Sequence, residues 1–127
     1  MKPSNFADIL SRINSGLDYE AIDAALSRYL AEGDLDARYL KTQYHSGSAF
    51  DGDTFDQWKV GELAALSRLG QADSMFQLGL LHVEGDLAVR DKDRAATLIA
   101  MAAIMGCKEA ERMIRRDFGR LWDHADR

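Results

Sequence analysis

Histidine side chains are the first candidates for chemistry in this sequence, because histidine alone has an ordinary pKa that brings its charge change near neutral pH. The chain has three, His45, His82 and His124, scattered along its length. No cysteine or acidic residue is placed to partner both His45 and His82, and no ligands cluster at the spacing of a zinc site. Structural roles are therefore favoured. A small enzyme that uses His45 or His82 with a neighbouring acid is the alternative.

A second candidate is the set Asp51, Asp53 and Glu62, whose spacing faintly resembles a calcium-binding loop. In such a loop the fifth position supplies an oxygen ligand and the sixth is glycine. Here those positions hold Phe55 and Asp56, so a polar hinge loop is predicted instead. The sequence also lacks a glycine-rich phosphate loop, a nucleophile elbow and a His-Glu-x-x-His motif. We therefore expect no catalytic residue, no metal and no cofactor.

The single cysteine, Cys107, follows Gly106 at the start of an expected helix. The positive end of the helix dipole could lower its thiol pKa there, although a structural or incidental cysteine is the favoured interpretation. One cysteine cannot form an internal disulfide bond, which agrees with a reducing cytoplasm.

The composition is that of a soluble globular domain: 127 residues, 46% hydrophobic and 29% charged. A net charge of −5, from 21 acidic and 16 basic residues, argues against nucleic-acid binding and weakly favours a basic partner protein. No apolar run approaches the roughly 20 residues needed to cross a bilayer, and the first residues lack the apolar segment of a secretory signal. We predict a cytoplasmic protein that binds neither nucleic acid nor membrane.

The sequence signals for secondary structure are strongest between Gly70 and Ala110. Apolar residues recur there at three- and four-residue spacing in two successive patterns, which predicts two amphipathic helices joined by a short polar hinge. Asp91 is placed to cap the second helix. Gly85 and Gly106 are placed to end each helix in the left-handed conformation.

Gly79 lies inside the first of these helices, where glycine costs about 1 kcal/mol relative to alanine. Ala102 and Ala103 add a second place with almost no side chain. Small residues at these points let two helix backbones approach closely. We therefore expect an antiparallel helix pair that stacks on copies of itself.

This pair resembles the Sel1-like repeat, a relative of the tetratricopeptide repeat. Nine residues match the family pattern at its spacing: Phe76, Leu78, Gly79, Gly85, Asp91, Ala95, Ala102, Ala103 and Gly106. Four depart from it: Ser74, His82, Leu87 and Leu98. The resemblance implies an all-α fold, a short α-solenoid of antiparallel helix pairs with about six to seven helices.

The repeat recurs in weaker form along the chain. Three corners share one pattern, a glycine, three mostly polar residues and a small residue, and their glycines, Gly33, Gly70 and Gly106, lie 37 and 36 residues apart. We predict a single domain over residues 1–127. Its parts are an N-terminal helix (1–16), degenerate repeats (18–69), the best-preserved repeat (70–106) and a capping helix (107–127).

Local signals place the remaining helices. Ser4 or Asn5 is expected to cap the first helix, and Asp18 the second, which ends at Gly33. A third helix is expected from Asp36 to about Ser46. A fourth is expected over residues 54–69, with a capping box formed by Thr54 and Gln57, and the last helix begins near Lys108.

In such an array the first helix of each pair lines a concave surface, where partners bind. The resemblance places these residues there: Asp36, Tyr39, Gln43, Ser46, Asp73, Phe76, Leu80, Val83, Glu84, Arg112, Arg116 and Arg120. The predicted groove runs from acidic through apolar to basic, which suits a peptide or helix with an apolar anchor and flanking charges.

The expected function is a non-catalytic protein–protein interaction module, or adaptor, that binds a protein or peptide on this surface. Small bacterial proteins of the family partner toxins, secretion components or signalling enzymes, so an immunity protein that neutralises a basic toxin or effector is an alternative. The chain is expected to be a monomer or a weak homo-oligomer.

Overall fold

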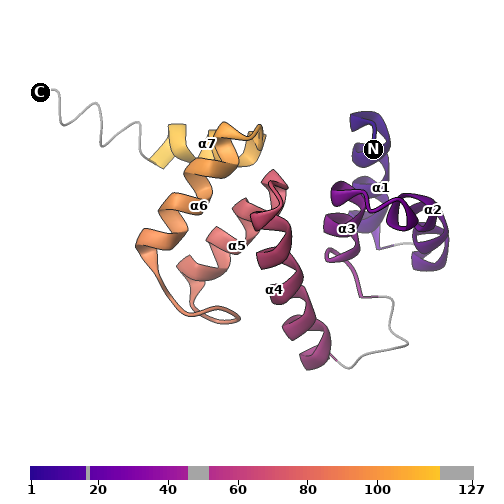
Figure 1. Ribbon diagram of the computed structural model, residues 1–127, viewed down its shortest axis with the longest axis horizontal. Coiled ribbons are helices and arrows are strands. Elements are labelled where there is room, and N and C mark those ends of the chain that lie inside the picture. Colours follow the sequence, from indigo (N-terminus) through magenta and orange to yellow (C-terminus); the bar gives the residue numbers. More distant parts are fainter. Residues whose placement is uncertain (17, 46–51, 118–127) are drawn as a thin grey trace, which may run out of the picture. The chain divides into compact units, whose positions relative to one another are not determined.

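The computed structural model describes residues 1–16, 18–45 and 52–117, and this part of the chain folds into seven helices (Figure 1). They are α1 (Pro3–Ser15), α2 (Tyr19–Ala31), α3 (Leu35–Lys41), α4 (Gly52–Arg68), α5 (Ala72–Glu84), α6 (Lys92–Ile104) and α7 (Lys108–Asp117). The expected all-α class is confirmed. Among the described residues, no helix combines the length and the apolar character needed to cross a membrane.

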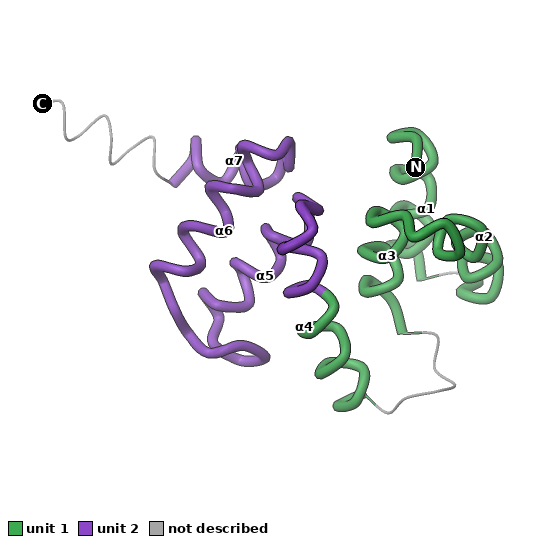
Figure 2. Tube along the Cα trace, in the orientation of Figure 1, with its two compact units in different colours: residues 1–62 green, residues 63–127 purple. Residues whose placement is uncertain are grey.

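The chain divides into two compact units, residues 1–62 and residues 63–127 (Figure 2). Helix α4 contributes to both. Within each unit, helices that follow one another in the sequence pack together: α1, α2 and α3 in the first, and α5, α6 and α7 in the second. The single-domain organisation expected for the whole chain stays a prediction.

Helix α1 begins earlier than predicted. Pro3 occupies its first turn and Lys2 is its N-cap residue, without a side-chain hydrogen bond, so the predicted capping by Ser4 or Asn5 is wrong. Proline suits the first helical position, because its fixed φ is helical and the missing N–H has no partner there anyway. The helix ends at Gly16, whose φ of 68° is left-handed.

Two aspartates start the next helices. The Asp18 carboxylate accepts a hydrogen bond from the Ala21 N–H at 3.2 Å, which confirms the predicted cap of α2. Asp34 caps α3 in the same way through the Ala37 N–H at 2.8 Å.

Helix α3 ends at Lys41, short of the expected end near Ser46. The Thr42 hydroxyl donates a 2.5 Å hydrogen bond to the Tyr39 carbonyl, and the Gln43 N–H bonds to the Leu40 carbonyl at 3.0 Å. A hydroxyl that binds nearby backbone competes with helix continuation. These shorter bonds tighten the last turn and end the helix.

The core of the first unit combines aliphatic side chains with aromatic pairs. Ile22, Leu26 and Leu40 are fully buried. Phe6 stacks on Tyr39 with ring centroids 6.1 Å apart, and Tyr19 stacks on Tyr44 at 5.3 Å. Offset aromatic pairs at these separations stabilise beyond the area that they bury.

A polar cluster joins α2 to the segment after α3. The Asp23 carboxylate accepts hydrogen bonds from Lys41 Nζ at 2.6 Å and from the Tyr44 hydroxyl, and Lys41 Nζ lies 5.0 Å from the centre of the Tyr44 ring. Partial burial pushes the pKa of Asp23 up, but the hydrogen bonds from Lys41 and Tyr44 and the charge of Lys41 together outweigh it, so the pKa is lowered. The cluster therefore needs the ionised carboxylate.

We expect Asp23→Asn to lower the free energy of unfolding by about 1 kcal/mol at neutral pH. A carboxyl whose folded pKa is lowered contributes fully above its unfolded pKa of about 3.9, and that contribution is lost as the pH falls through the folded value. The stabilities of wild type and variant should therefore converge in acid. Urea unfolding followed by circular dichroism at several pH values measures this convergence.

The matched control is Asp8→Asn. Asp8 pairs with Arg12 at 3.2 Å, but both side chains are more than half exposed, so its effect should stay small at every pH. A gap between wild type and Asp23→Asn that does not change with pH would contradict the assignment.

Helix α4 begins at Gly52, so Thr54 lies inside it and the predicted capping box with Gln57 is wrong. The ring of Phe55 lies 4.8 Å from that of His45 and 5.6 Å from that of Trp58, centroid to centroid. This group of rings connects the start of α4 to the segment after α3.

In the second unit, α5 and α6 form the predicted hairpin. Asp91 caps α6 by accepting a hydrogen bond from the Arg94 N–H at 3.0 Å, as expected. Gly85 and Gly106 have φ values of 75° and 103°, which confirms the left-handed ends. The cap of α5 was not predicted: the buried Gln71 side chain accepts from the Ser74 N–H at 2.7 Å.

Gly79 is the point of closest approach between α5 and α6. A Cβ added there would lie 2.8 Å from Ile99 Cγ1 and 3.2 Å from the Ala95 carbonyl oxygen. The first distance is shorter than real Cβ atoms show and the second is tight, so any side chain here would force the two helices or Ile99 to shift. The predicted role of Gly79 is confirmed.

The core of this unit extends from the hairpin to α7. Its buried members are Met75, Ile99, Ala102, Cys107 and Ala110. Partly buried apolar residues, among them residues of α5 and α7, pack against this cluster. The same contacts fix the distance between those two helices, which matters for the site.

Candidate functional site

A groove of about 420 Å³ lies on the second unit, between α5 and α7. It is lined by Phe76, Leu80, Glu109, Arg112, Met113 and Arg116. The apolar members Phe76, Leu80 and Met113 also pack against the buried core, so the floor of the groove is held by the fold. The charged members come from α7 and are largely exposed.

The structure brings together four of the residues predicted for the concave surface: Phe76, Leu80, Arg112 and Arg116. Sequence reasoning missed Glu109 and Met113. The signal was present, because positions 109, 112, 113 and 116 have the spacing of one helix face.

The other predicted positions of the second unit do not line this groove. Val83 and Glu84 are exposed at the end of α5. Asp73 is partly buried and accepts a 3.1 Å hydrogen bond from Gln71 Nε2. Arg120 lies outside the described residues.

In the first unit, Tyr39 is only 7% exposed and stacks on Phe6, so its ring belongs to the core rather than to a binding surface. Asp36 and Gln43 are half-buried, and Ser46 lies outside the described residues. No groove lined by these residues accompanies the one on the second unit among the described pockets.

The cations of α7 differ in their partners. Arg115 pairs with Glu111 at 2.7 Å, and Arg116 pairs with Asp117 at 2.9 Å. The hydrogen bonds that Arg116 donates to the Asp117 carboxylate raise the pKa of Arg116. Arg112 forms no ion pair or hydrogen bond with any side chain in the described part of the chain. Its guanidinium therefore lines the groove without a close ion-pair partner among the described residues.

The two described histidines make structural contacts. His82 Nδ1 lies 2.7 Å from the Val89 carbonyl oxygen and so ties the end of α5 to the loop before α6. His45 follows the end of α3, not its interior as expected, and lies against the Phe55 ring. Neither lines a described pocket. His124 lies outside the described residues.

The side chains that could bind a metal ion are also dispersed. Within residues 1–16, 18–45 and 52–117, no group of three or more histidine, cysteine or acidic side chains could hold a metal ion. Asp53, from the segment that resembles a calcium loop, lies in the first turn of α4. Asp51 is outside the described residues.

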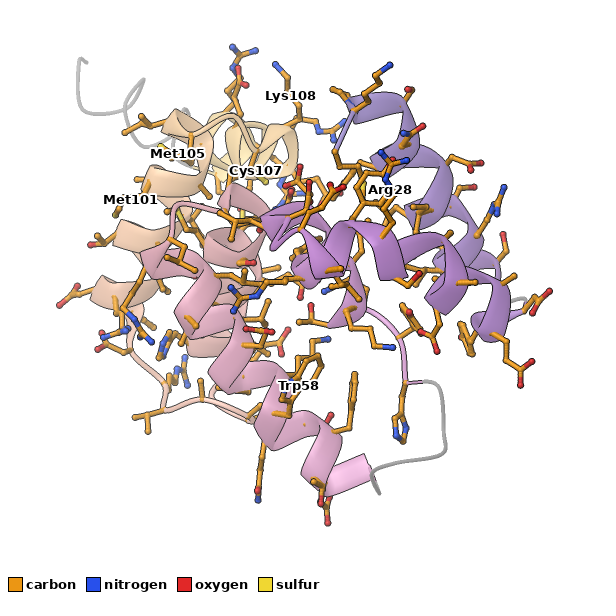
Figure 3. The ribbon with its side chains drawn as sticks, turned by 45° about the vertical axis from the view of Figure 1, so that its right-hand side comes forward. Arg28, Trp58, Met101, Met105, Cys107 and Lys108 are labelled. Atoms are coloured by element: carbon orange, nitrogen blue, oxygen red, sulfur yellow. The ribbon has the colours of Figure 1, made fainter. Side chains whose placement is uncertain are left out.

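Cys107 lies at the junction of α6 and α7, where it is 4% exposed (Figure 3). Burial raises the pKa of its thiol, and the nearby Asp73 acts in the same direction, while the backbone N–H of Ala110 opposes them. This is opposite to the disfavoured alternative, in which the helix dipole lowers the pKa, and it agrees with the favoured structural interpretation. The thiol serves as a small apolar core group.

The outer side of α6 carries exposed apolar side chains. Met101, Ile104 and Met105 are 45%, 83% and 54% exposed. Met101 and Met105 are labelled in Figure 3. None of the three lines the groove. The expected state of a monomer or a weak homo-oligomer stays a prediction.

A smaller hollow of about 230 Å³ lies between α1 and α2 in the first unit. Its one cation, Arg12, already pairs with Asp8 at 3.2 Å, and the Ser15 hydroxyl donates to the Ser11 carbonyl at 2.9 Å. Its polar groups are therefore satisfied locally, which leaves the groove between α5 and α7 as the stronger candidate.

Compared with known proteins, the chain matches no family model, no curated protein and no solved structure. The described part of the chain has seven helices packed in sequential pairs. Its groove combines an apolar floor with one arginine that has no ion-pair partner among the described residues.

Proposed function

We propose that the chain is a Sel1-like repeat protein whose helices stack as a short α-solenoid. Support comes from five matching positions with the physical roles that such a repeat needs. Gly79 permits the close approach of two helices, Asp91 caps the second helix, and Gly85 and Gly106 end the helices. Ala102 is fully buried in the core that joins the hairpin to α7.

We further propose that the protein is a non-catalytic interaction module that binds a segment of a partner protein between α5 and α7. The observation that carries this proposal is the groove itself, in which Phe76, Leu80 and Met113 are partly exposed beside Arg112. An apolar floor with a polar rim is the usual anatomy of a protein interface. Mid-helix side chains that are already packed can bind with little loss of conformational entropy.

A random peptide library displayed on phage tests this function. Selection on the full chain should enrich peptides with a large apolar residue. For the best peptide, Leu80→Ala should weaken binding about tenfold, because it removes part of the apolar floor. Fluorescence anisotropy with the labelled peptide measures the dissociation constant.

The matched control is Leu87→Ala, which truncates the same residue type in the loop between α5 and α6, where Leu87 is 41% exposed and outside the groove. It should leave the affinity unchanged. If no peptide is enriched, or if both variants weaken binding equally, the groove is not the binding site.

A further inference from the structure

The geometry points to an acidic partner segment: one aspartate or glutamate side chain pairs with Arg112 while a neighbouring apolar side chain fills the floor between Phe76, Leu80 and Met113. This inference rests on the proposed function, because it names the chemistry of the segment that the groove binds. It starts from the difference between Arg112 and the other cations of its helix.

Arg112 lines the groove and has no carboxylate partner among the described side chains. Arg115 and Arg116 are held by Glu111 and Asp117 at 2.7 and 2.9 Å, whereas Arg112 has no such partner among the described side chains. A guanidinium presents a planar set of donors that matches a carboxylate in two parallel hydrogen bonds. Next to an apolar floor, such a pair is partly shielded from water, which strengthens it.

Glu109 limits the charge of the anion. It lines the same groove, one helical turn before Arg112 and Met113. Arg116 is neutralised by Asp117, so the charge of Arg112 alone balances one carboxylate but leaves the second charge of a phosphate facing Glu109. The groove therefore favours aspartate or glutamate over a phosphorylated side chain.

The carboxylate should belong to a side chain rather than to a chain end. Terminal carboxylates are usually captured by free backbone N–H groups. Here Phe76 and Leu80 lie within α5, and Arg112, Met113 and Arg116 lie within α7, where backbone N–H groups bond inside the helix. At the start of α7, where the first N–H groups have no partner inside the helix, those of Glu109 and Ala110 interact with the Cys107 sulfur. Recognition by the groove therefore relies on side chains.

The sign of this local charge is opposite to that of the whole chain, which carries −5. A strongly acidic partner would be repelled at a distance, so we expect a segment with one well-placed acid and basic or neutral surroundings. A partner with a basic surface and one acidic residue at the contact would therefore suit both the net charge of the chain and Arg112.

The test uses the enriched phage peptides and the full chain. Selected peptides should share an acidic residue near a large apolar one. Arg112→Gln should weaken the best peptide about tenfold, whereas Arg115→Gln, in an adjacent exposed position, should not. A peptide with its acid changed to lysine should lose binding to wild type and regain it with Arg112→Glu. Thermal melts verify that each variant is folded.

Each other result decides against the inference. If Leu80→Ala weakens binding and Arg112→Gln does not, the groove binds a segment but not through a carboxylate. If a peptide with phosphoserine in place of the acid binds more tightly, the anion is a phosphate. If a C-terminal acid is required, a chain end is bound. If neither variant has an effect, both the inference and the proposed function fail.

The groove could instead be filled by a second copy of the chain or by residues 118–127, and each would give its own experimental result. If light scattering detects a dimer that Arg112→Gln dissociates, a second copy fills the groove. If Trp122→Ala strengthens peptide binding about tenfold, residues 118–127 compete for it. Either result would overturn the assignment to a partner segment.

Discussion

Gly79→Val is expected to lower the free energy of unfolding by about 3 kcal/mol, the upper end for overpacking a close-packed core. The first added carbon would lie 2.8 Å from Ile99 Cγ1 and 3.2 Å from the Ala95 carbonyl oxygen, and the second contact is with backbone that cannot rotate away. Helices α5 and α6 would have to separate. Chemical denaturation followed by circular dichroism measures the loss.

The control is Gly61→Val in the exposed part of α4, where an added Cβ meets nothing within 4 Å. Valine and glycine have similar helix propensities, so the expected change is within about 0.5 kcal/mol. Equal effects at the two glycines would mean that α5 and α6 do not meet closely at Gly79.

Ile99→Ala should be the most destabilising of the substitutions considered, at about 3–4 kcal/mol. Ile99 is 3% exposed and lies in the buried cluster that joins α5, α6 and α7. Truncation leaves a cavity that the neighbouring helices cannot fill completely. The free energy of unfolding, from urea titration at one pH, gives its magnitude.

The double variant sharpens this prediction, because Ile99→Ala removes the atom that a side chain at position 79 would strike. We expect Gly79→Val with Ile99→Ala to be less destabilised than the sum of the two single changes by about 1–2 kcal/mol. A strictly additive result would show that the contact between these positions does not determine the cost. If Gly79→Val alone does not fold, Gly79→Ala gives the same cycle with a smaller effect.

Local rules predicted the hairpin in detail. Gly85, Gly106 and Asp91 each satisfy a backbone requirement that a single residue type reveals. Gly79 was predictable because an interior helix glycine is costly and implies a compensating contact. Such features depend on the backbone of a few neighbouring residues, which the sequence contains.

Features that depend on burial could not be predicted in this way. Gln71 caps α5 although glutamine is not a preferred N-cap residue, and its buried side chain also bonds to Asp73 and to the Ser74 hydroxyl. Cys107 has a raised thiol pKa because tertiary contacts surround it, and the helix dipole alone suggested the reverse. The early end of α3 at Thr42 depends on a side-chain bond to the backbone that competes with the helical pattern.

The candidate site was predictable in part. Phe76, Leu80, Arg112 and Arg116 follow from the repeat register, and the spacing of α7 could also have included Glu109 and Met113. What the sequence could not show is which arginine is unpaired, because four basic and three acidic side chains compete within one short helix.

Helix α5 packs closely against α6 on one side and lines the groove on another. Gly79 faces α6 at close range, while Phe76 and Leu80 line the groove. The stability of the hairpin and the proposed binding therefore depend on different residues of one helix. A substitution that keeps the floor of the groove apolar would change the proposed specificity without disturbing the close approach at Gly79.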